Sequence, residues 1–115
     1  MSFSHKAIPI LRVKDAPAAV VWYQQLGFRE DWRFQYEPGY PWFISVSTPE
    51  GATIFLTEHE GDCSFGGTVF LVTNDIANAE IALGVKAQKM PWGDLQLSVI
   101  DLDGNGVRVS QPGDL

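Results

Sequence analysis

Two stretches of this chain follow the same pattern, and this repetition limits the possible folds more than any other feature. Residues 10–27 read ILRVKDAPAAVVWYQQLG, and residues 69–84 read VFLVTNDIANAEIALG. In both, an apolar strand leads to an aspartate that can cap a helix, and a glycine then ends that helix. We therefore expect two halves built to one plan.

The first half continues with further strands. Alternating side chains predict strands over residues 28–36, 40–48 and 52–58, with a bulge near Asp31 and Trp32 where the sides change. The first strand of this half, residues 7–13, contains Pro9, which favours a sheet edge, a bulge or a crossing point between subunits.

The second half repeats this order after a loop rich in Gly, Asp and Ser. A strand over residues 68–72 and a helix over residues 76–83 precede a short, poorly patterned segment and a hairpin. Both halves thus read β-α-β-β-β, an α+β arrangement within a single domain, residues 1–115. Module 1 is expected over about residues 7–59 and module 2 over about residues 67–111.

The hairpin over residues 92–109 is the clearest local pattern. Residues 95–99 alternate apolar and polar side chains, an Asp-Gly turn follows, and residues 107–109 resume the alternation. The turn also fits the first half of an EF-hand calcium loop. That loop requires glutamate at its twelfth position, which here is Pro112, and helices on both sides. A plain turn between strands is the preferred interpretation.

Composition limits the class of protein. The net charge of −6 disfavours nucleic acid as a partner and suits a cationic small molecule, although acidity also serves solubility. The sequence has no apolar run long enough to predict a membrane span. The lone cysteine, Cys63, cannot form an internal disulfide, and no neighbouring cation marks it as a nucleophile. We expect a cytoplasmic protein.

Three motifs carry a family resemblance. The strand and cap IPILRVKD, the helix end WYQQLGF, and PWG followed by DLDGN resemble the vicinal-oxygen-chelate superfamily, also called the glyoxalase/bleomycin resistance protein/dioxygenase superfamily. Pro9, Phe55 and the PWG motif resemble bleomycin resistance proteins in particular. The resemblance implies paired βαβββ modules that form a curved mixed sheet with a groove, and a homodimer with an arm exchanged near the first strand.

Metal-dependent members of this superfamily hold a divalent ion with four strand residues. Along the matched motifs, those positions correspond here to Ile8, Phe55, Gly67 and Arg108. Two are hydrocarbon, one has no side chain and one is a cation, so none can bind a metal. We therefore expect no metal and no other cofactor.

If these four positions face the groove, alternation along the strands assigns the remaining side chains. The groove side then includes Ile10, Thr53, Thr57, Val69, Gln96, Ser98 and Ser110. The side beneath the helices includes Leu11, Val13, Ile54, Leu56, Phe70, Val72, Leu97, Val99, Val107 and Val109. This division sends most aliphatic residues to the core.

Four tryptophans are many for a chain of 115 residues, and aromatic residues cluster around the second and third strands and the hairpin entrance. Such side chains can pack a core, or can line a cleft that stacks planar rings and attracts cations. Trp22 is expected to be structural because it lies on the first helix. The candidate ligand-binding residues are Trp32, Phe34, Trp42, Phe55, Thr57, Trp92, Gln96, Ser98 and Arg108.

The resemblance implies a non-catalytic small-molecule binding protein that sequesters a bleomycin-type antibiotic, cationic and with planar rings, in an aromatic groove at a dimer interface. The sequence shows no catalytic set that would argue for an enzyme. Two alternatives remain. One is a vicinal-oxygen-chelate enzyme with an atypical metal site, with the metal recruited by Glu58, His59 and Glu60; the other is a binding protein for an unrelated aromatic metabolite.

Overall fold

The computed structural model describes residues 3–113, and it confirms two halves with the same order of elements. Module 1 contains β1 (Ile10–Arg12), α1 (Ala16–Gln24), β2 (Arg29–Phe34), β3 (Phe43–Ser47) and β4 (Thr53–Thr57). Module 2 contains β5 (Thr68–Val72), α2 (Ile76–Leu83), β6 (Gln88–Lys89), β7 (Leu95–Ile100) and β8 (Gly106–Gln111). None of the helices in residues 3–113 is long and apolar enough to cross a membrane.

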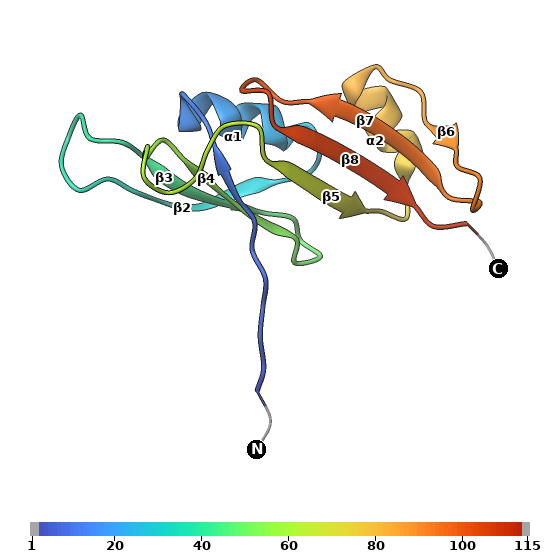
Figure 1. The fold of residues 1–115 in the computed structure, drawn as a ribbon, viewed down its shortest axis with the longest axis horizontal. Coiled ribbons are helices and arrows are strands. Elements are labelled where there is room, and N and C mark those ends of the chain that lie inside the picture. The colour runs from blue at the N-terminus through green and yellow to red at the C-terminus, as the bar shows by residue number, and fades with distance from the viewer. Residues whose placement is uncertain (1–2, 114–115) are drawn as a thin grey trace.

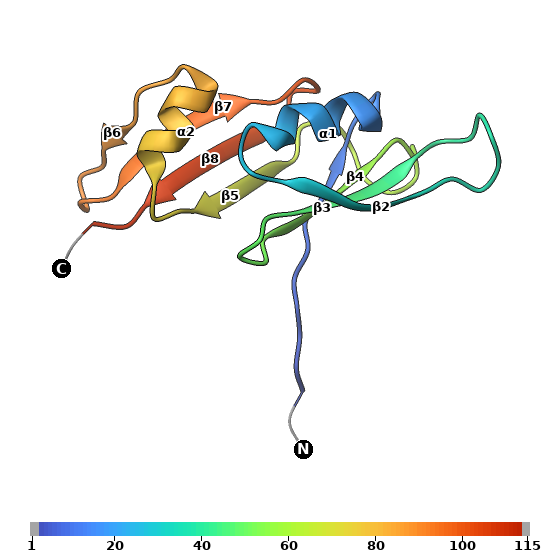
Figure 2. The ribbon, with the colours of Figure 1, turned by 180° about the vertical axis from the view of Figure 1, so that it is seen from behind.

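The strands form two mixed sheets of four strands each, one from each module. The order is β1-β4-β3-β2 in the first sheet and β5-β8-β7-β6 in the second. In each sheet the module's first and last strands pair in parallel, and the remaining pairs are antiparallel. Figures 1 and 2 show the sheets beside each other, with α1 and α2 on one side of them.

Each helix begins at an aspartate and is tied to the last strand of its own module. The side chains of Asp15 and Asp75 accept hydrogen bonds from the third residue after them and so cap α1 and α2. Glu58, after β4, accepts from the Ala16 N–H at 2.7 Å, and Gln111, at the end of β8, accepts from the Ile76 N–H at 2.9 Å. The two modules therefore use the same device to attach helix to sheet.

The hydrophobic core lies between the helices and the sheet faces they cover. Burial is deepest for side chains that alternate along the central strands and for one face of α1. The largest of these are Tyr23, Phe28, Ile44, Ile54, Leu56, Val13, Val46 and Val107. Trp22 is half-buried against this core, as expected for a structural residue.

The turn between β7 and β8 connects the two modules. The buried carboxylate of Asp101 accepts from the Tyr23 hydroxyl of α1 at 2.7 Å and from the backbone N–H groups of Asp103 and Asn105. The Asn105 amide donates to the Arg12 carbonyl of β1 at 3.0 Å and accepts from the Gly67 N–H, also at 3.0 Å. We call this set of hydrogen bonds the inter-module clamp.

The same turn confirms the interpretation of the hairpin as strand, turn and strand. Asp101 N–H donates to the Asn105 carbonyl at 2.9 Å, and Gly104 adopts the left-handed conformation with φ of 83°. In module 1, the turn between β3 and β4 has the same pattern, because Thr48 N–H donates to the Ala52 carbonyl at 2.9 Å. The oxygens of Asp101 are thus used in a turn and in the clamp.

Residues 3–9 form an extended arm that leaves the sheets on the side opposite the helices (Figures 1 and 2). The sequence predicted that the first strand begins at residue 7, but in the structure it begins at Ile10. Pro9 has no N–H to contribute to a strand pair, although its carbonyl accepts from the Phe55 N–H at 3.0 Å. β1 is an edge strand of its sheet, which is one of the three possibilities that Pro9 left open.

Candidate functional site

The sheet faces turned away from the helices, which we call the open face, carry an aromatic wall. On the first sheet, the rings of Trp32, Phe43 and Phe55 touch one another. Trp32 and Phe43 stack with centroids 5.9 Å apart and planes at 8°, and Phe55 lies 5.5 Å from Trp32 and 5.1 Å from Phe43. Trp32 is nevertheless 46% exposed, so part of its ring remains free for a ligand.

A pocket of about 360 Å³ adjoins this wall. Phe34 packs edge-on against Tyr36 at 4.9 Å, and Tyr36 packs edge-on against His59 at 6.0 Å. The lining consists of Trp32, Phe34, Tyr36, Phe43, His59 and Asp62. Five rings and one carboxylate make a surface suited to planar and cationic groups.

A β-bulge in β2 turns this wall toward the open face. The pairing with β3 shifts between Glu30 and Trp32, as the sequence predicted, and leaves Asp31 without a partner across the strands. After the shift, Trp32 pairs with Ser45 and Phe34 with Phe43. Side chains of directly paired residues point to the same side, so the two hairpin strands present their rings together.

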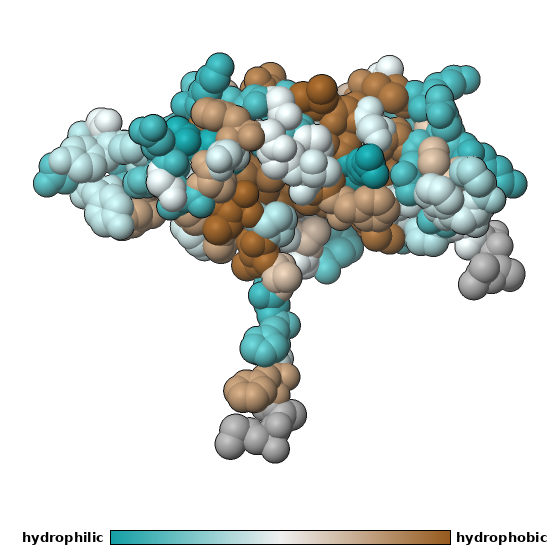
Figure 3. Space-filling model, in the orientation of Figure 1, coloured by the Kyte–Doolittle hydropathy of each residue, from teal (hydrophilic) through white to brown (hydrophobic). Residues whose placement is uncertain are grey.

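The open face continues on the second sheet with different chemistry. Arg108 pairs with Phe70 on one side and with Ser98 on the other, and Gln96 pairs with Ser110. The predicted side for Gln96, Ser98 and Arg108 is therefore confirmed. Figure 3 shows apolar side chains gathered in the middle of the molecule, where the two sheets meet, with hydrophilic groups at both ends.

The predicted sides of β5 are wrong. Val69, expected on the groove side, is buried at 7% exposure, whereas Phe70 and Val72, expected beneath the helices, are 51% and 67% exposed. The pairing of Phe70 with Arg108 fixes this orientation. The sequence TVFLV is apolar at nearly every position, so its alternation could not reveal which side faces the core. Gly67 corresponds to a ligand position in the metal-dependent members of the superfamily. It faces the core and not the groove, because a Cβ there would lie 3.0 Å from a Leu11 methyl group.

Three other predicted residues lie away from the aromatic wall. Trp42 packs against the core, with the Arg33 guanidinium 5.1 Å from its ring centroid. Trp92 is exposed in the turn before β7, where its indole N–H donates to Asp94 at 3.1 Å. Thr57 lies on the open-face side of β4 but is 0% exposed, and its hydroxyl donates to Asp62 at 2.6 Å. Trp32, Phe34 and Phe55 are the predicted residues that the fold brings together.

Sequence reasoning missed Phe43 and chose its neighbour Trp42. The signal was present, because Ile44 and Val46 are aliphatic and alternate with Phe43, Ser45 and Ser47. Trp42 shares the side of Ile44 and Val46, which is the core side. No pattern in the sequence could have placed His59, because it lies beyond the end of β4 in an irregular loop.

The metal site considered at residues 58–60 does not form. Both carboxylate oxygens of Glu58 accept backbone N–H groups, one from Ala16 and one from Trp42, at 2.7 and 2.9 Å. His59 turns toward the Tyr36 ring. Within residues 3–113, no three His, Cys, Asp or Glu side chains are grouped so that they could hold a metal ion.

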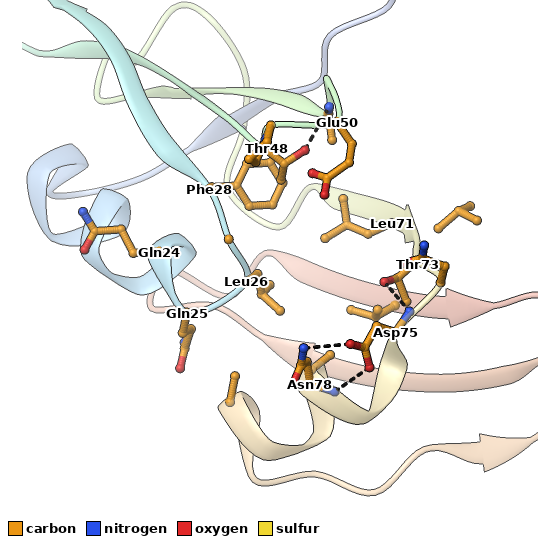
Figure 4. Close-up of a pocket in the computed structure, with 18 of the residues that line it drawn as sticks. Gln24, Gln25, Leu26, Phe28, Thr48, Glu50, Leu71, Thr73, Asp75 and Asn78 are labelled. Atoms are coloured by element: carbon orange, nitrogen blue, oxygen red, sulfur yellow. Dashed lines mark hydrogen bonds between the residues drawn. The ribbon is translucent and has the colours of Figure 1, made fainter.

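A larger cavity, of about 1600 Å³, lies between the end of α1, the β3–β4 turn, β5 and α2 (Figure 4). Its polar groups are used locally: Asp75 accepts from the Asn78 backbone and side chain, and Thr73 and Thr48 each accept a nearby N–H. None of the predicted site residues lines it. The aromatic wall is therefore the better candidate for ligand binding.

The chain belongs to the glyoxalase superfamily, because a family model described as "Glyoxalase superfamily protein" matches residues 1–114. No curated protein matches the sequence. Among solved structures, a member of the glyoxalase/bleomycin resistance protein/dioxygenase superfamily from Sphaerobacter thermophilus DSM 20745 is similar with a TM-score of 0.77 and 24% identity. That match covers 96% of this chain and 98% of the other.

Two further structures share the fold and have a named ligand class. A bleomycin-binding protein complexed with bleomycin matches with a TM-score of 0.70 and 17% identity, over 95% of this chain and 99% of that one. TnmS3, an antibiotic binding protein from Streptomyces sp. CB03234, matches with a TM-score of 0.77 and 22% identity, over 98% of this chain and 99% of the other. The TM-scores and the nearly complete coverage establish the shared fold.

Proposed function

We propose that this chain is a non-catalytic binding protein that sequesters a small molecule with planar rings, of the bleomycin type, against the aromatic wall. One observation carries this proposal: Trp32, Phe43 and Phe55 form a contiguous ring surface on the sheet face opposite α1, where Trp32 is 46% exposed. Each ring that stacks well on a ligand contributes about 1 kcal/mol. Sequestration requires affinity and no nucleophile or metal.

The proposed groove is closed by a second copy of the chain. The open faces of both sheets lie on one side, and the arm over residues 3–9 leaves from that same side (Figure 1). Exposed apolar residues on this side, among them Ile10, Phe34, Phe70 and Val72, favour a protein partner. In such a homodimer, the second sheet of one copy faces the aromatic wall of the other, and Gln96, Ser98 and Arg108 form the opposite wall.

The similar structures support the ligand class. One is a bleomycin-binding protein with its drug and another is an antibiotic binding protein, and both share the whole fold with this chain. An unrelated aromatic metabolite remains the alternative ligand, because the wall would stack any planar ring of suitable size.

The proposal is tested by titrating the purified protein with copper-free and copper-loaded bleomycin. Tryptophan fluorescence reports on all four tryptophans, of which Trp32 lies in the aromatic wall, and calorimetry measures the stoichiometry. We expect saturable quenching at submicromolar drug, with about one or two molecules per dimer. No response at high micromolar drug would exclude bleomycin-type sequestration and direct a screen toward other aromatic compounds.

A first prediction tests whether the aromatic wall binds the ligand. Trp32→Ala removes the stacked face and should weaken ligand binding about tenfold or more. Trp42→Phe is the matched control, because Trp42 packs on the core side of the same hairpin and should leave the affinity unchanged. Calorimetric titration of both variants measures the effect. Equal losses would mean that the wall is not the binding surface.

A further inference from the structure

Two carboxylates on the open face are held in place by hydroxyl groups of the sheet. Asp31, the extra residue of the β2 bulge, accepts from the Ser45 hydroxyl at 2.8 Å and from the Ser47 hydroxyl at 2.5 Å. Asp62, in the loop after β4, accepts from the Thr57 hydroxyl at 2.6 Å. Ser45 and Thr57 are buried, so these donors are fixed by the fold. Hydrogen bonds from such donors hold a carboxylate in one orientation.

The aromatic wall lies between the two carboxylates. Ser47, which holds Asp31, is also hydrogen-bonded to Thr53 of β4 at 2.9 Å. Thr57, which holds Asp62, lies four residues further along the same strand, and Phe55 lies between them. Asp31 is held by both Ser47 and Ser45, and Ser45 pairs with Phe55. At about 3.3 Å per residue, the two carboxylates are therefore anchored about 7–13 Å apart along the sheet. Each end of the ring surface is therefore marked by a negative charge.

Neither carboxylate is neutralised within the chain. In the part of the chain from residue 3 to residue 113, no Lys, Arg or His lies within ion-pairing distance of Asp31 or Asp62. Arg33, two residues from Asp31, forms an ion pair with Glu30 at 2.6 Å, and Arg12 lies over the Phe65 ring at 4.6 Å from its centroid. Arg29 pairs across the strands with Ser47 and forms no ion pair with Asp31. The charge at both ends of the wall is thus available to a ligand.

We propose that Asp31 and Asp62 determine specificity for a ligand with a planar aromatic centre and a cationic group at each end. This inference rests on the proposed function, since it assumes that the wall stacks the ligand's rings. It goes further by assigning the charge of the ligand and the spacing of its cations. The ring surface supplies affinity, and the two carboxylates select dications over neutral or singly charged compounds.

The test uses two probes with one ring system. The dye 4′,6-diamidino-2-phenylindole carries an amidinium group at each end, and 2-phenylindole is its uncharged core. We expect the wild-type protein to bind the dication about a hundredfold more tightly than the neutral core, with an affinity that falls as salt is added. Asp31→Asn and Asp62→Asn keep a hydrogen-bond acceptor but remove the charge. Each should weaken dication binding about tenfold and leave binding of the neutral core unchanged.

The matched control is Glu50→Gln, which changes the net charge by the same amount in the exposed β3–β4 turn, off the open face. It should leave both affinities unchanged. Equal binding of both probes, or an effect confined to one of the two aspartates, would overturn the two-cation specificity while the ring surface stands. Failure of both probes to bind, or binding that Trp32→Ala does not weaken, would refute the proposed function itself and this inference with it.

Discussion

Asp101 shows how much one side chain can determine. Its carboxylate accepts four hydrogen bonds, from the Tyr23 hydroxyl, from two backbone N–H groups of its own turn and from the Asn105 amide. The Asp-Gly signal predicted the turn, because glycine is needed where φ is positive. The contact with Tyr23 spans 78 positions of the sequence, and no local pattern could have predicted it.

Removing this carboxylate should destabilise the whole protein. Asp101→Ala leaves buried donors without an acceptor, and we expect the free energy of unfolding to fall by about 2–4 kcal/mol. Tyr23→Phe removes a single donor and should cost about 1 kcal/mol. Urea denaturation followed by circular dichroism measures both values. A loss in Asp101→Ala no larger than in Tyr23→Phe would contradict the role of the clamp.

The same pair predicts a dependence of stability on pH. Burial raises the pKa of Tyr23 well above its ordinary value, and the hydrogen bond to Asp101 raises it further. Folding therefore opposes ionisation of Tyr23. Its stabilising contribution is complete below the unfolded pKa of about 10 and is lost as the pH rises above it. Between about pH 8 and about pH 11, the wild type should lose more unfolding free energy than Tyr23→Phe. Equal losses would contradict this assignment.

At the scale of elements, patterns that depend on neighbours in sequence were predictable. The helix caps at Asp15 and Asp75, the bounds of α2 and β5 and the bulge at Asp31 all follow from local chemistry. The side on which β5 shows Phe70 was not predictable, because it is set by pairing with Arg108 in a distant strand. The choice of Trp42 over Phe43 was wrong and could have been avoided, because the alternation of side chains along β3 places Phe43 on the open face.

The attachment of the helices to the sheets provides an element-scale prediction. Glu58 accepts two backbone N–H groups, from Ala16 and Trp42, whereas its counterpart Gln111 accepts one, from Ile76. Glu58→Ala should therefore lower the free energy of unfolding by about 1–3 kcal/mol, and Gln111→Ala by about 1 kcal/mol. Chemical denaturation of the two variants compares them. A larger loss from Gln111→Ala would show that these contacts do not control the stability of the modules.

At the scale of the molecule, the repeat predicted two modules of one plan, but it could not predict how they contact each other. That contact is made by single residues, such as Asp101 against Tyr23 and Asn105 against Arg12, which have no counterpart in the repeat. The proposed pairing with a second copy would likewise depend on the exposed surface. The open face carries rings, carboxylates, Arg12 and Arg29 on the first sheet, and Phe70, Ser98 and Arg108 on the second.

The exposed apolar side chains of the second sheet predict how the proposed dimer can be broken. Phe70→Glu places a charge on the exposed centre of this sheet, which the proposed dimer would bury against the aromatic wall of the other copy. We expect it to yield monomers with the 12.7 kDa mass of one chain, while the wild type sediments at about twice that mass. Ile81→Glu, on the exposed side of α2, is the control and should remain dimeric. A wild type that sediments as a monomer would refute the proposed dimer.

The turns of the two modules have the same backbone hydrogen bond, yet within residues 3–113 only the β7–β8 turn forms side-chain hydrogen bonds with the other module. The β3–β4 turn closes on itself through Thr48 and Ala52, while the β7–β8 turn extends Asp101 and Asn105 into the other module. The two modules therefore differ in function at this turn, although they share the same order of strands and helices. A chain made of two first modules would repeat every strand and helix but would lack the hydrogen bonds of the inter-module clamp. The order of the two modules is therefore part of what the sequence encodes.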